Sequence, residues 1–452
     1  MSNDKENTKT NASDGEREQC KDLAKEYFFV NVQYEGTKEL NSMKKKLKIK
    51  QQLGESSAVR IVERDKHFVP EKEESVGSVI KTKACTLRKE YHDLDSNRKA
   101  IVSLGLNSIL DLSYKYPDAQ STLFNNRQWL HFKRTNKPKE YVSTEYAYIS
   151  EILKPIFKAY NPAKTSDENL KALYVQTKTL MEQNDPEIDV RKKDISFCIH
   201  VMLQILMAVK HEPGLFSDTV NSSEWDYIVK FWGPITQRLF YFSGLRLKWG
   251  DTHLTLHDTI GDIVLKVDLR IIHDSIKQRY NVENEVGVAE VAEENPGSVK
   301  FSSDRCKVLI ESKAIVDRFI LDGCHIDNVD SLQICGMEIY FIKLELRDNG
   351  LYIGTQHYHS VVDASLNSLE KYIELAFNLM CFRDRCIEIY NTYENHLASS
   401  RGQQKSTKRP APRHIDDEMS TKQTWIRGSW NPPRTTKTPP PPEPSNLYFK
   451  EQ

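Results

Sequence analysis

Two apolar stretches in the middle of the chain, each interrupted by one acidic residue, constrain the fold most strongly. Asp268 stands in Lys-Val-Asp-Leu-Arg (266–270) and Glu290 in Val-Ala-Glu-Val-Ala (288–292), and both stretches have the composition of buried β-strands. A carboxylate inside a protein destabilises the fold unless it is paired, hydrogen-bonded or bound to a cation. Two such acids on consecutive predicted strands therefore favour a divalent-metal site.

The residues around this pair predict a helix, three strands, a second helix and further strands. The first helix begins at Ser223, a suitable N-cap with Glu224 in the first turn, and Gly233-Pro234 is expected to kink it. Trp225, Trp232 and Phe240 recur at helical spacing, which favours packing in a core over a base-stacking role. The predicted elements are a helix over 222–242, strands over 245–249, 262–272 and 285–292, a helix over 303–321, a β-rich stretch over 332–362 and a long helix over 364–397. Asp348-Asn349-Gly350 predicts a hairpin turn.

The rest of the chain divides by composition. Residues 1–20 are polar and predicted to be disordered, 21–215 form a mainly helical amino-terminal region of unknown role, and 399–452 form a disordered basic, proline-rich tail. The second domain is expected over 216–398. Residues 95–112, 143–160, 166–183 and 194–210 have helical patterns. The most apolar run, 195–209, is shorter than the roughly 20 residues that span a bilayer, so it predicts a core helix and no membrane segment.

Charge and cysteine content limit the functions that this chain can have. Lys+Arg and Asp+Glu both total 64, so no global field attracts nucleic acid or acidic lipid, and any basic surface must be local. The 8 cysteines are scattered, which is typical of reduced thiols in an intracellular protein. The basic stretches 44–50 and 405–413 are open to two interpretations: a solvated, solubilising segment, or a nucleic-acid or nuclear-import segment that would make the protein nuclear.

The order helix, strand, strand, strand, helix, strand, with acids on the second and third strands, resembles the restriction-endonuclease-like PD-(D/E)XK superfamily. More narrowly, five short motifs look like those of an uncharacterised fungal family of such domains, which is related to the nuclease-like modules of Crinkler-type effectors and mobile elements. The motifs are Ser-Glu-Trp-Asp (223–226), Lys-Trp-Gly-Asp (248–251), Lys-Val-Asp (266–268), Glu-Val-Ala (290–292) and Asp-Arg-Cys-Lys (304–307). The resemblance covers roughly residues 222–391. It implies an α/β (α+β) fold with an αβββαβ domain, a mixed central sheet and a long C-terminal helix.

The resemblance also implies a site. Asp268 takes the place of the motif's Asp and Glu290 that of its Asp/Glu, while Glu224 matches an acid on the first helix and Asp251 an acid near the start of the sheet. These four residues would hold Mg²⁺ or Mn²⁺ for endonuclease cleavage of DNA. Such an ion held by carboxylates activates water and neutralises the charge that builds on the phosphate.

One position departs from the motif. Ala292 stands where the superfamily has its catalytic lysine, and two residues are candidates to replace it. Lys266 shares a strand face with Asp268, and Lys307 lies on the following predicted helix. A rival alignment uses the literal E-x-K of Glu311 and Lys313, but it requires 308–310 to be a strand, whereas the apolar residues recur at helical spacing.

Interpretations other than a metal-dependent nuclease stay open. A catalytically inactive nuclease fold would bind nucleic acid or protein, and the amino-terminal half is a second candidate surface for a protein partner. The acids could instead be structural and pair with Lys248, Lys266 and Arg270. The pair Cys381 and Cys386 has no second cysteine pair to complete a zinc site. His357 and His359 share a strand face without an evident third ligand.

Overall fold

The computed structural model describes residues 65, 68–71, 73–113, 119–138, 147–217, 219–256, 263–277, 280–405, 422–433, 440, 441 and 443. The predictions made for residues 1–20 and for the basic stretch 44–50 lie outside these residues, as does most of 405–413.

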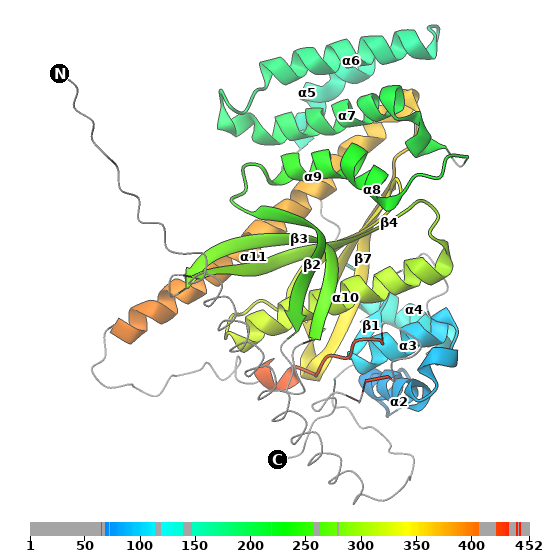
Figure 1. Ribbon diagram of the computed structural model, residues 1–452, viewed down its shortest axis with the longest axis vertical. Coiled ribbons are helices and arrows are strands. Elements are labelled where there is room, and N and C mark those ends of the chain that lie inside the picture. The colour runs from blue at the N-terminus through cyan, green and yellow to red at the C-terminus, as the bar shows by residue number, and fades with distance from the viewer. Residues whose placement is uncertain are drawn as a thin grey trace, which may run out of the picture. The chain divides into compact units, whose positions relative to one another are not determined.

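Within the described residues the strands form one seven-stranded mixed sheet in the order β1-β7-β6-β5-β4-β3-β2 (Figure 1). β2, β3 and β4 form an antiparallel meander, β5 lies parallel to β4, β5, β6 and β7 form a second antiparallel meander, and β1 lies parallel to β7. The strands are β1 (Ile109–Asp111), β2 (Arg246–Leu256), β3 (Ile263–Lys277), β4 (Tyr280–Ala292), β5 (Asn328–Cys335), β6 (Glu338–Arg347) and β7 (Leu351–Val361). The protein is thus of the mixed α/β class that the sequence predicts.

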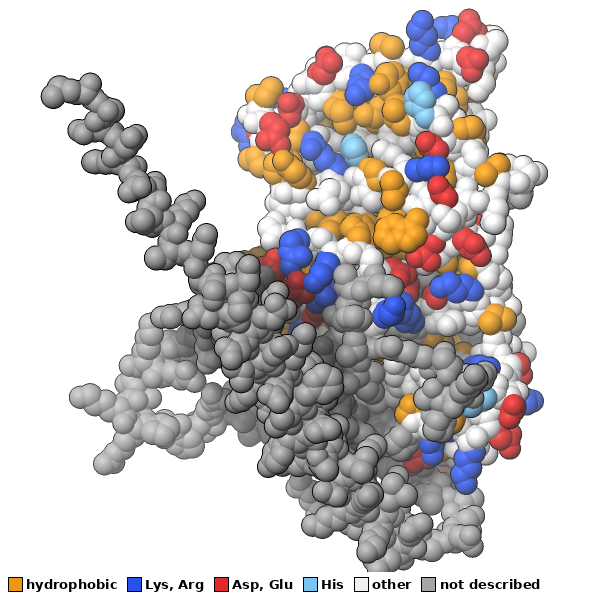
Figure 2. Space-filling view, in the orientation of Figure 1, with side chains coloured by type: hydrophobic (Ala, Val, Ile, Leu, Met, Phe, Trp, Pro, Cys, Tyr) orange, Lys and Arg blue, Asp and Glu red, His pale blue; other side chains and the backbone are white. Residues whose placement is uncertain are grey.

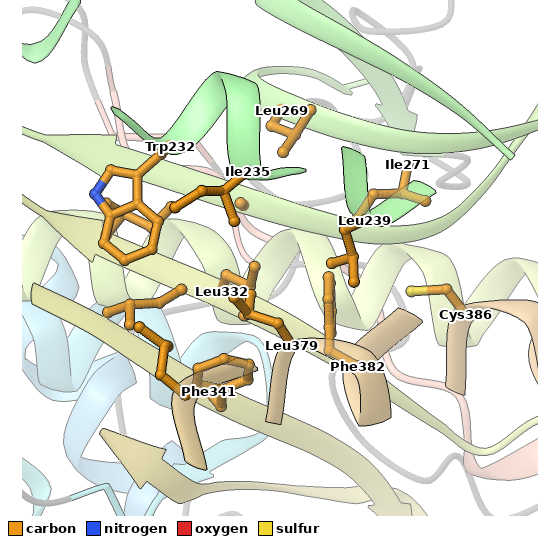
Figure 3. Close-up of a cluster of buried hydrophobic side chains, with 14 of the residues drawn as sticks. Trp232, Ile235, Leu239, Leu269, Ile271, Leu332, Phe341, Leu379, Phe382 and Cys386 are labelled. Atoms are coloured by element: carbon orange, nitrogen blue, oxygen red, sulfur yellow. The ribbon is translucent and has the colours of Figure 1, made fainter. Parts of the chain in front are cut away.

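Two layers of helices enclose this sheet. The parallel pairing of β4 with β5 requires a crossover, and α10 (Gly297–Leu321) supplies it along one face. On the opposite face lie α9 (Gly233–Phe240) and α11 (Tyr372–Lys405). Figure 3 shows Ile235 and Leu239 of α9, Leu269 and Ile271 of β3, and Phe382 of α11 meeting in one buried cluster. Side chains alternate along a strand, and Leu269 and Ile271 point toward α9 and α11. Asp268, which precedes Leu269, and Arg270, which follows it, therefore face α10.

The described part of the predicted amino-terminal helical region, from residue 65 on, belongs to the same compact unit, which spans Ile61–Gln452. Its helices are α2 (Val76–Arg88), α3 (Ser96–Leu106), α4 (Asn126–Thr135), α5 (Ala147–Lys158), α6 (Ser166–Gln183) and α7 (Lys193–His211). α3 packs against α10, and β1, which lies in a stretch predicted to be helix, extends the sheet beside β7. The boundary expected between residues 215 and 216 therefore falls inside one unit.

One segment of the described chain, Val190–His211, is long and apolar enough to cross a membrane by length and composition. It contains α7, and most of it is buried inside the protein, where α7 contacts α6, α9 and α11. This is the core helix that the sequence predicts rather than evidence for a membrane protein. The described chain also contains short helical turns at Tyr91–Asp93, Ala119–Leu123, Val190–Lys192, Pro213–Phe216, Asp348–Gly350 and Leu366–Lys371.

The helix predicted over 222–242 forms in three parts. Ser223 caps α8 (Glu224–Tyr227), because Ser223 Oγ accepts a hydrogen bond from the Asp226 N–H at 3.3 Å and Asp226 returns one. A π-helical turn, Ile228–Trp232, then joins α8 to α9. The Gly233 N–H donates to the Ile228 carbonyl, so a wide turn takes the place of the expected kink at Pro234.

Part of the predicted disordered tail is packed against this unit. Residues 422–433 are described, and Trp430 is 1% exposed beside Tyr91, with ring centroids 5.3 Å apart. Trp430 and Asn107 exchange hydrogen bonds of 2.9 and 2.7 Å. Disorder is therefore the wrong description of 422–433, because an aromatic anchor and a polar pair tie this stretch to the fold.

Candidate functional site

The site lies where β3 and β4 separate. Their ladder ends at the pair Leu269 and Ala289, and β4 continues to Ala292 paired with β5 instead. Side chains take over the missing ladder bonds: the Val291 N–H donates to Asp268 Oδ2 at 3.0 Å, and the Asp268 N–H donates to Glu290 Oε1 at 3.4 Å. The two acids selected from the sequence are thus brought together, and each also satisfies a backbone group.

Lys307 of α10 completes the cluster. Its ammonium group donates to Glu290 Oε2 and lies 3.9 Å from Asp268 Oδ1. The Glu290 side chain is 1% exposed, that of Asp268 18% and that of Lys307 31%, so the cluster opens to solvent on the Asp268 and Lys307 side. Burial lowers the pKa of Lys307, but the negative charges of Glu290, Glu311 and Asp268 outweigh it and raise this pKa above its usual range. Of the two candidate lysines, Lys307 stands at the acids, whereas Lys266 is exposed on β3.

A third carboxyl group, Glu311, lies behind the pair. It is fully buried one turn after Lys307, and neither of its oxygens accepts a hydrogen bond within the described part of the chain. Burial and the charge of Glu290 raise the pKa of Glu311 well above its usual range, and burial and the charge of Asp268 do the same to Glu290. Both groups therefore hold a proton to higher pH than an exposed glutamate does.

Glu311 was singled out in the sequence only as part of the rival E-x-K alignment, and that alignment is wrong. Residues 308–310 lie in α10, and Lys313 points away from the acids. Lys313 is fully buried and donates to Asp317 Oδ2 at 2.6 Å, to the Arg427 carbonyl at 2.7 Å and to Ser429 Oγ at 3.0 Å. The spacing of four residues between Lys307 and Glu311 was the available signal, because it places both on one helix face.

Two further acids stand around this centre. Burial raises the pKa of Glu224, as do the charges of Asp268 and Asp304, against the opposing effect of Lys300 and Lys307. Asp304 is buried and paired with Lys300 at 2.9 Å. Among the described side chains, the cluster contains five carboxyl groups, from Glu224, Asp268, Glu290, Asp304 and Glu311, and two ammonium groups, from Lys300 and Lys307.

The backbone of Asp251 lies opposite Asp268 on the neighbouring strand β2. Trp249 pairs with Leu269 and Thr252 with Val267, so Gly250 and Asp251 together oppose Asp268 in a β-bulge. Gly250 has φ +90°, a conformation that glycine adopts without strain. The side chain of Asp251 is outside the described atoms, so its predicted role as a metal ligand stays a prediction.

Two of the three cations proposed as structural partners of the acids, Lys248 and Arg270, pair elsewhere. Lys248 Nζ lies 2.9 Å from Glu283, and Arg270 and Arg318 both donate to the buried carboxylate of Glu285. In this neighbouring network Lys248 and Arg270 form ion pairs with Glu283 and Glu285 and not with Asp268 or Glu290. Asp268 and Glu290 are left to Lys307.

Ala292 lies in an apolar wall. It is fully buried among Phe301, Cys335 and Tyr340. Arg305 covers the Phe301 and Tyr340 rings at 5.6 and 5.7 Å and donates to Gln333 Oε1 at 2.7 Å. A lysine at position 292 would place an ammonium group in this apolar cluster, which explains why the cation of the site comes from α10 instead.

No group of three or more His, Cys, Asp or Glu side chains in the described ranges is arranged to hold a metal ion. His359 stacks on Tyr340 with ring centroids 4.4 Å apart, and Cys381 and Cys386 are thiols on α11. Mg²⁺ commonly uses only one or two protein carboxylates together with water and phosphate oxygens. The oxygen-only donor set of Asp268 and Glu290, with the unbonded oxygens of Glu311 behind it, fits that chemistry.

We compared the chain with protein-family models, curated proteins and solved structures, and none of them matches it.

Proposed function

We propose that this protein is a metal-dependent phosphodiesterase that cleaves nucleic acid, with DNA as the expected substrate. The observation that carries the proposal is the meeting of Asp268, Glu290 and Lys307 where β3 leaves β4. The element order supports it: α9, β2, β3, β4, α10 and β5 follow one another along the chain with β5 parallel to β4, and the PD-(D/E)XK resemblance implies an αβββαβ order.

The charges of the site support the same chemistry. A phosphodiester approaching Asp268 and Glu290 would be repelled wherever these two carboxyl groups are ionised, and a cation bound by them would remove that repulsion. Asp268 and Glu290 would hold Mg²⁺ or Mn²⁺, which supplies an activated water and stabilises charge on the phosphate. Lys307, which is partly exposed beside both acids, would offer its ammonium group to the phosphate or to the attacking water. Glu224, whose carboxyl group is influenced by the charge of Asp268, would be a further ligand of this ion.

A second candidate function is a catalytically inactive module of the same fold that binds nucleic acid or protein. Two observations favour it: the ammonium group of Lys307 already forms an ion pair with Glu290, and Ala292 occupies the motif's lysine position inside an apolar wall. In this alternative Lys307 acts in place of a metal ion and neutralises the pair permanently.

Cleavage of plasmid and single-stranded DNA with Mg²⁺ or Mn²⁺ separates the two functions. We expect activity in the wild type and its loss in Asp268→Ala and Lys307→Met. Asp189→Ala and Lys154→Met, which alter residues of ion pairs distant in sequence from the acids, are the matched controls and should keep full activity. No cleavage by the wild type, or cleavage that survives Asp268→Ala, would leave the inactive module as the better description.

A further inference from the structure

Trp225 is an exposed aromatic residue at the edge of the acid cluster. The sequence predicted it to be a core residue like Trp232, but its side chain is 54% exposed, whereas Trp232 is fully buried. Figure 2 shows hydrophobic side chains at the surface over α8 and α9, close to acidic and basic ones. An exposed indole ring is costly to hydrate and favours a planar partner.

Two observations place Trp225 beside the site. It follows Glu224 directly in α8, and the charge of Asp268 acts on the Glu224 carboxyl group. A Cβ atom added to Gly250 would lie 3.9 Å from Cη2 of the Trp225 ring, and Gly250 belongs to the bulge that opposes Asp268. The ring therefore reaches the bulge that lies across from Asp268.

We propose that Trp225 stacks on an unpaired nucleobase of the nucleotide next to the phosphate that the acid cluster receives, so that the preferred substrate is single-stranded nucleic acid. This inference rests on the proposed function for the position of the phosphate. Aromatic rings stack on any base, but only one that is unpaired and unstacked from its neighbours. The charges of Lys300 and Lys307 act on the carboxyl group of Glu224, the residue before Trp225, and would also attract the backbone phosphates.

The neighbouring exposed residue Val229, one turn further along, makes a protein partner the competing occupant of this surface. The two occupants differ in what they require. A base needs the flat face of the indole and a phosphate site within one nucleotide, and the acid cluster supplies the second. A protein partner needs the apolar area of both residues and is indifferent to Lys307.

Binding is measured with the full-length protein, a labelled oligothymidylate and the same strand annealed to its complement, in Ca²⁺ to limit cleavage. We expect tighter binding of the single strand and quenching of tryptophan fluorescence by it. Trp225→Ala should weaken single-strand binding by about tenfold or more and remove most of the quenching, because stacking on one aromatic ring is worth about 1–3 kcal/mol. Trp225→Phe should recover much of the affinity. In cleavage assays Trp225→Ala should raise KM more than it lowers kcat.

Tyr241→Ala is the matched control, since Tyr241 is 58% exposed and follows α9 at the far end of the same helical stretch. Melting temperatures of both variants check that each folds. Unchanged single-strand affinity in Trp225→Ala, or equal binding of duplex and single strand, would overturn the inference while leaving cleavage intact. Quenching that depends on Trp225 without cleavage would instead overturn the proposed function alone. Absence of any nucleic-acid binding would overturn both and assign the surface to a protein partner.

Discussion

The ammonium group of Lys307 donates a hydrogen bond to the buried carboxylate of Glu290, across the space between α10 and β4. Lys307→Met removes the cation and leaves Glu290 buried beside Asp268 and Glu311. Breaking a fully buried pair costs about 3–5 kcal/mol. Because Lys307 is about a third exposed, we expect a loss of about 2 kcal/mol in the free energy of unfolding, measured by urea denaturation.

The double variant Glu290→Gln/Lys307→Met controls for lost packing. It should be less destabilised than the sum of the two single variants, with a coupling energy of about 1–3 kcal/mol. Additive effects would show that the pair contributes nothing beyond packing.

Divalent ions should stabilise the wild-type protein. A ligand that binds only the folded state raises the free energy of unfolding with its concentration, and the excess of carboxyl groups provides the attraction. Mn²⁺ should raise the melting temperature of the wild type and raise it further in Lys307→Met, because the competing ammonium group is gone. Asp268→Asn should abolish the increase. An equal shift in Asp268→Asn and the wild type would locate the ion elsewhere.

Stability should fall with rising pH because of Glu311 and Glu290. Burial raises the pKa values of both groups above the ordinary 4.5, and the charge of Asp268 at Glu290 and of Glu290 at Glu311 raises them further, so the folded state keeps protons that the unfolded chain has released. This contribution is present below the unfolded pKa and is lost as pH rises toward the folded values. The slope is about 1.4 kcal/mol per pH unit for each retained proton.

The variant Glu311→Gln has no titrating group at position 311, so its unfolding free energy should decline less steeply with rising pH than that of the wild type. We expect the variant to gain stability relative to the wild type between about pH 5 and 8. Parallel curves of unfolding free energy against pH for the two proteins would show that Glu311 titrates normally.

Glu285 should be the most sensitive acid of the neighbouring ion-pair network. It is buried and accepts from both Arg270 and Arg318, so Glu285→Gln removes the carboxylate that both guanidinium groups share and leaves Arg270 with Glu283 at 3.1 Å. We expect a loss of about 3–5 kcal/mol in unfolding free energy. Asp274→Asn, at a partly exposed pair with Arg246, should cost about 0–1 kcal/mol. Similar effects of the two substitutions would show that burial of the network does not matter.

The carboxyl-terminal segment should stabilise the whole unit. Trp430→Ala removes a buried ring from the pocket beside Tyr91 and should cost about 3–5 kcal/mol. Truncation after Lys405 should destabilise as well, because Lys313 then loses its bonds to Arg427 and Ser429.

Lys313→Met tests whether the carboxyl-terminal segment stabilises the protein through its hydrogen bonds to Lys313. In the full-length chain it should destabilise, because Asp317 loses its partner at 2.6 Å. In the truncated chain the same substitution should cost less or stabilise, since it removes a buried cation with only one partner left. Equal effects in both chains would mean that the segment does not satisfy Lys313.

Much of the architecture follows from local patterns. The helical spacing and the Ser223 capping box predicted α8 and α9, and Asp348-Asn349-Gly350 predicted the β6–β7 hairpin, in which Asn349 has φ +58°. These elements could be predicted because the residues that specify each of them lie close together in the sequence. The two acids were also recognisable, because a single carboxylate in an apolar strand is conspicuous at short range.

The remaining features depend on contacts between distant parts of the chain. The chain pairs β1 with β7, although residues 95–112 have a helical pattern, and Trp430 finds its pocket beside Tyr91. Neither contact has a local signature, since each stabilises only once the other elements are in place.

The sequence by itself determined the mixed α/β class, the core helix α7 and the two acids that mark the site. Only the tertiary structure decided that Lys307 rather than Lys266 stands beside those acids, that Glu311 lies unbonded behind them and that Trp225 is exposed at their edge. The physical reason is that burial and electrostatic partnership are properties of the space between elements. That space is set by how α10 and α8 pack on the sheet, which no single stretch of sequence encodes.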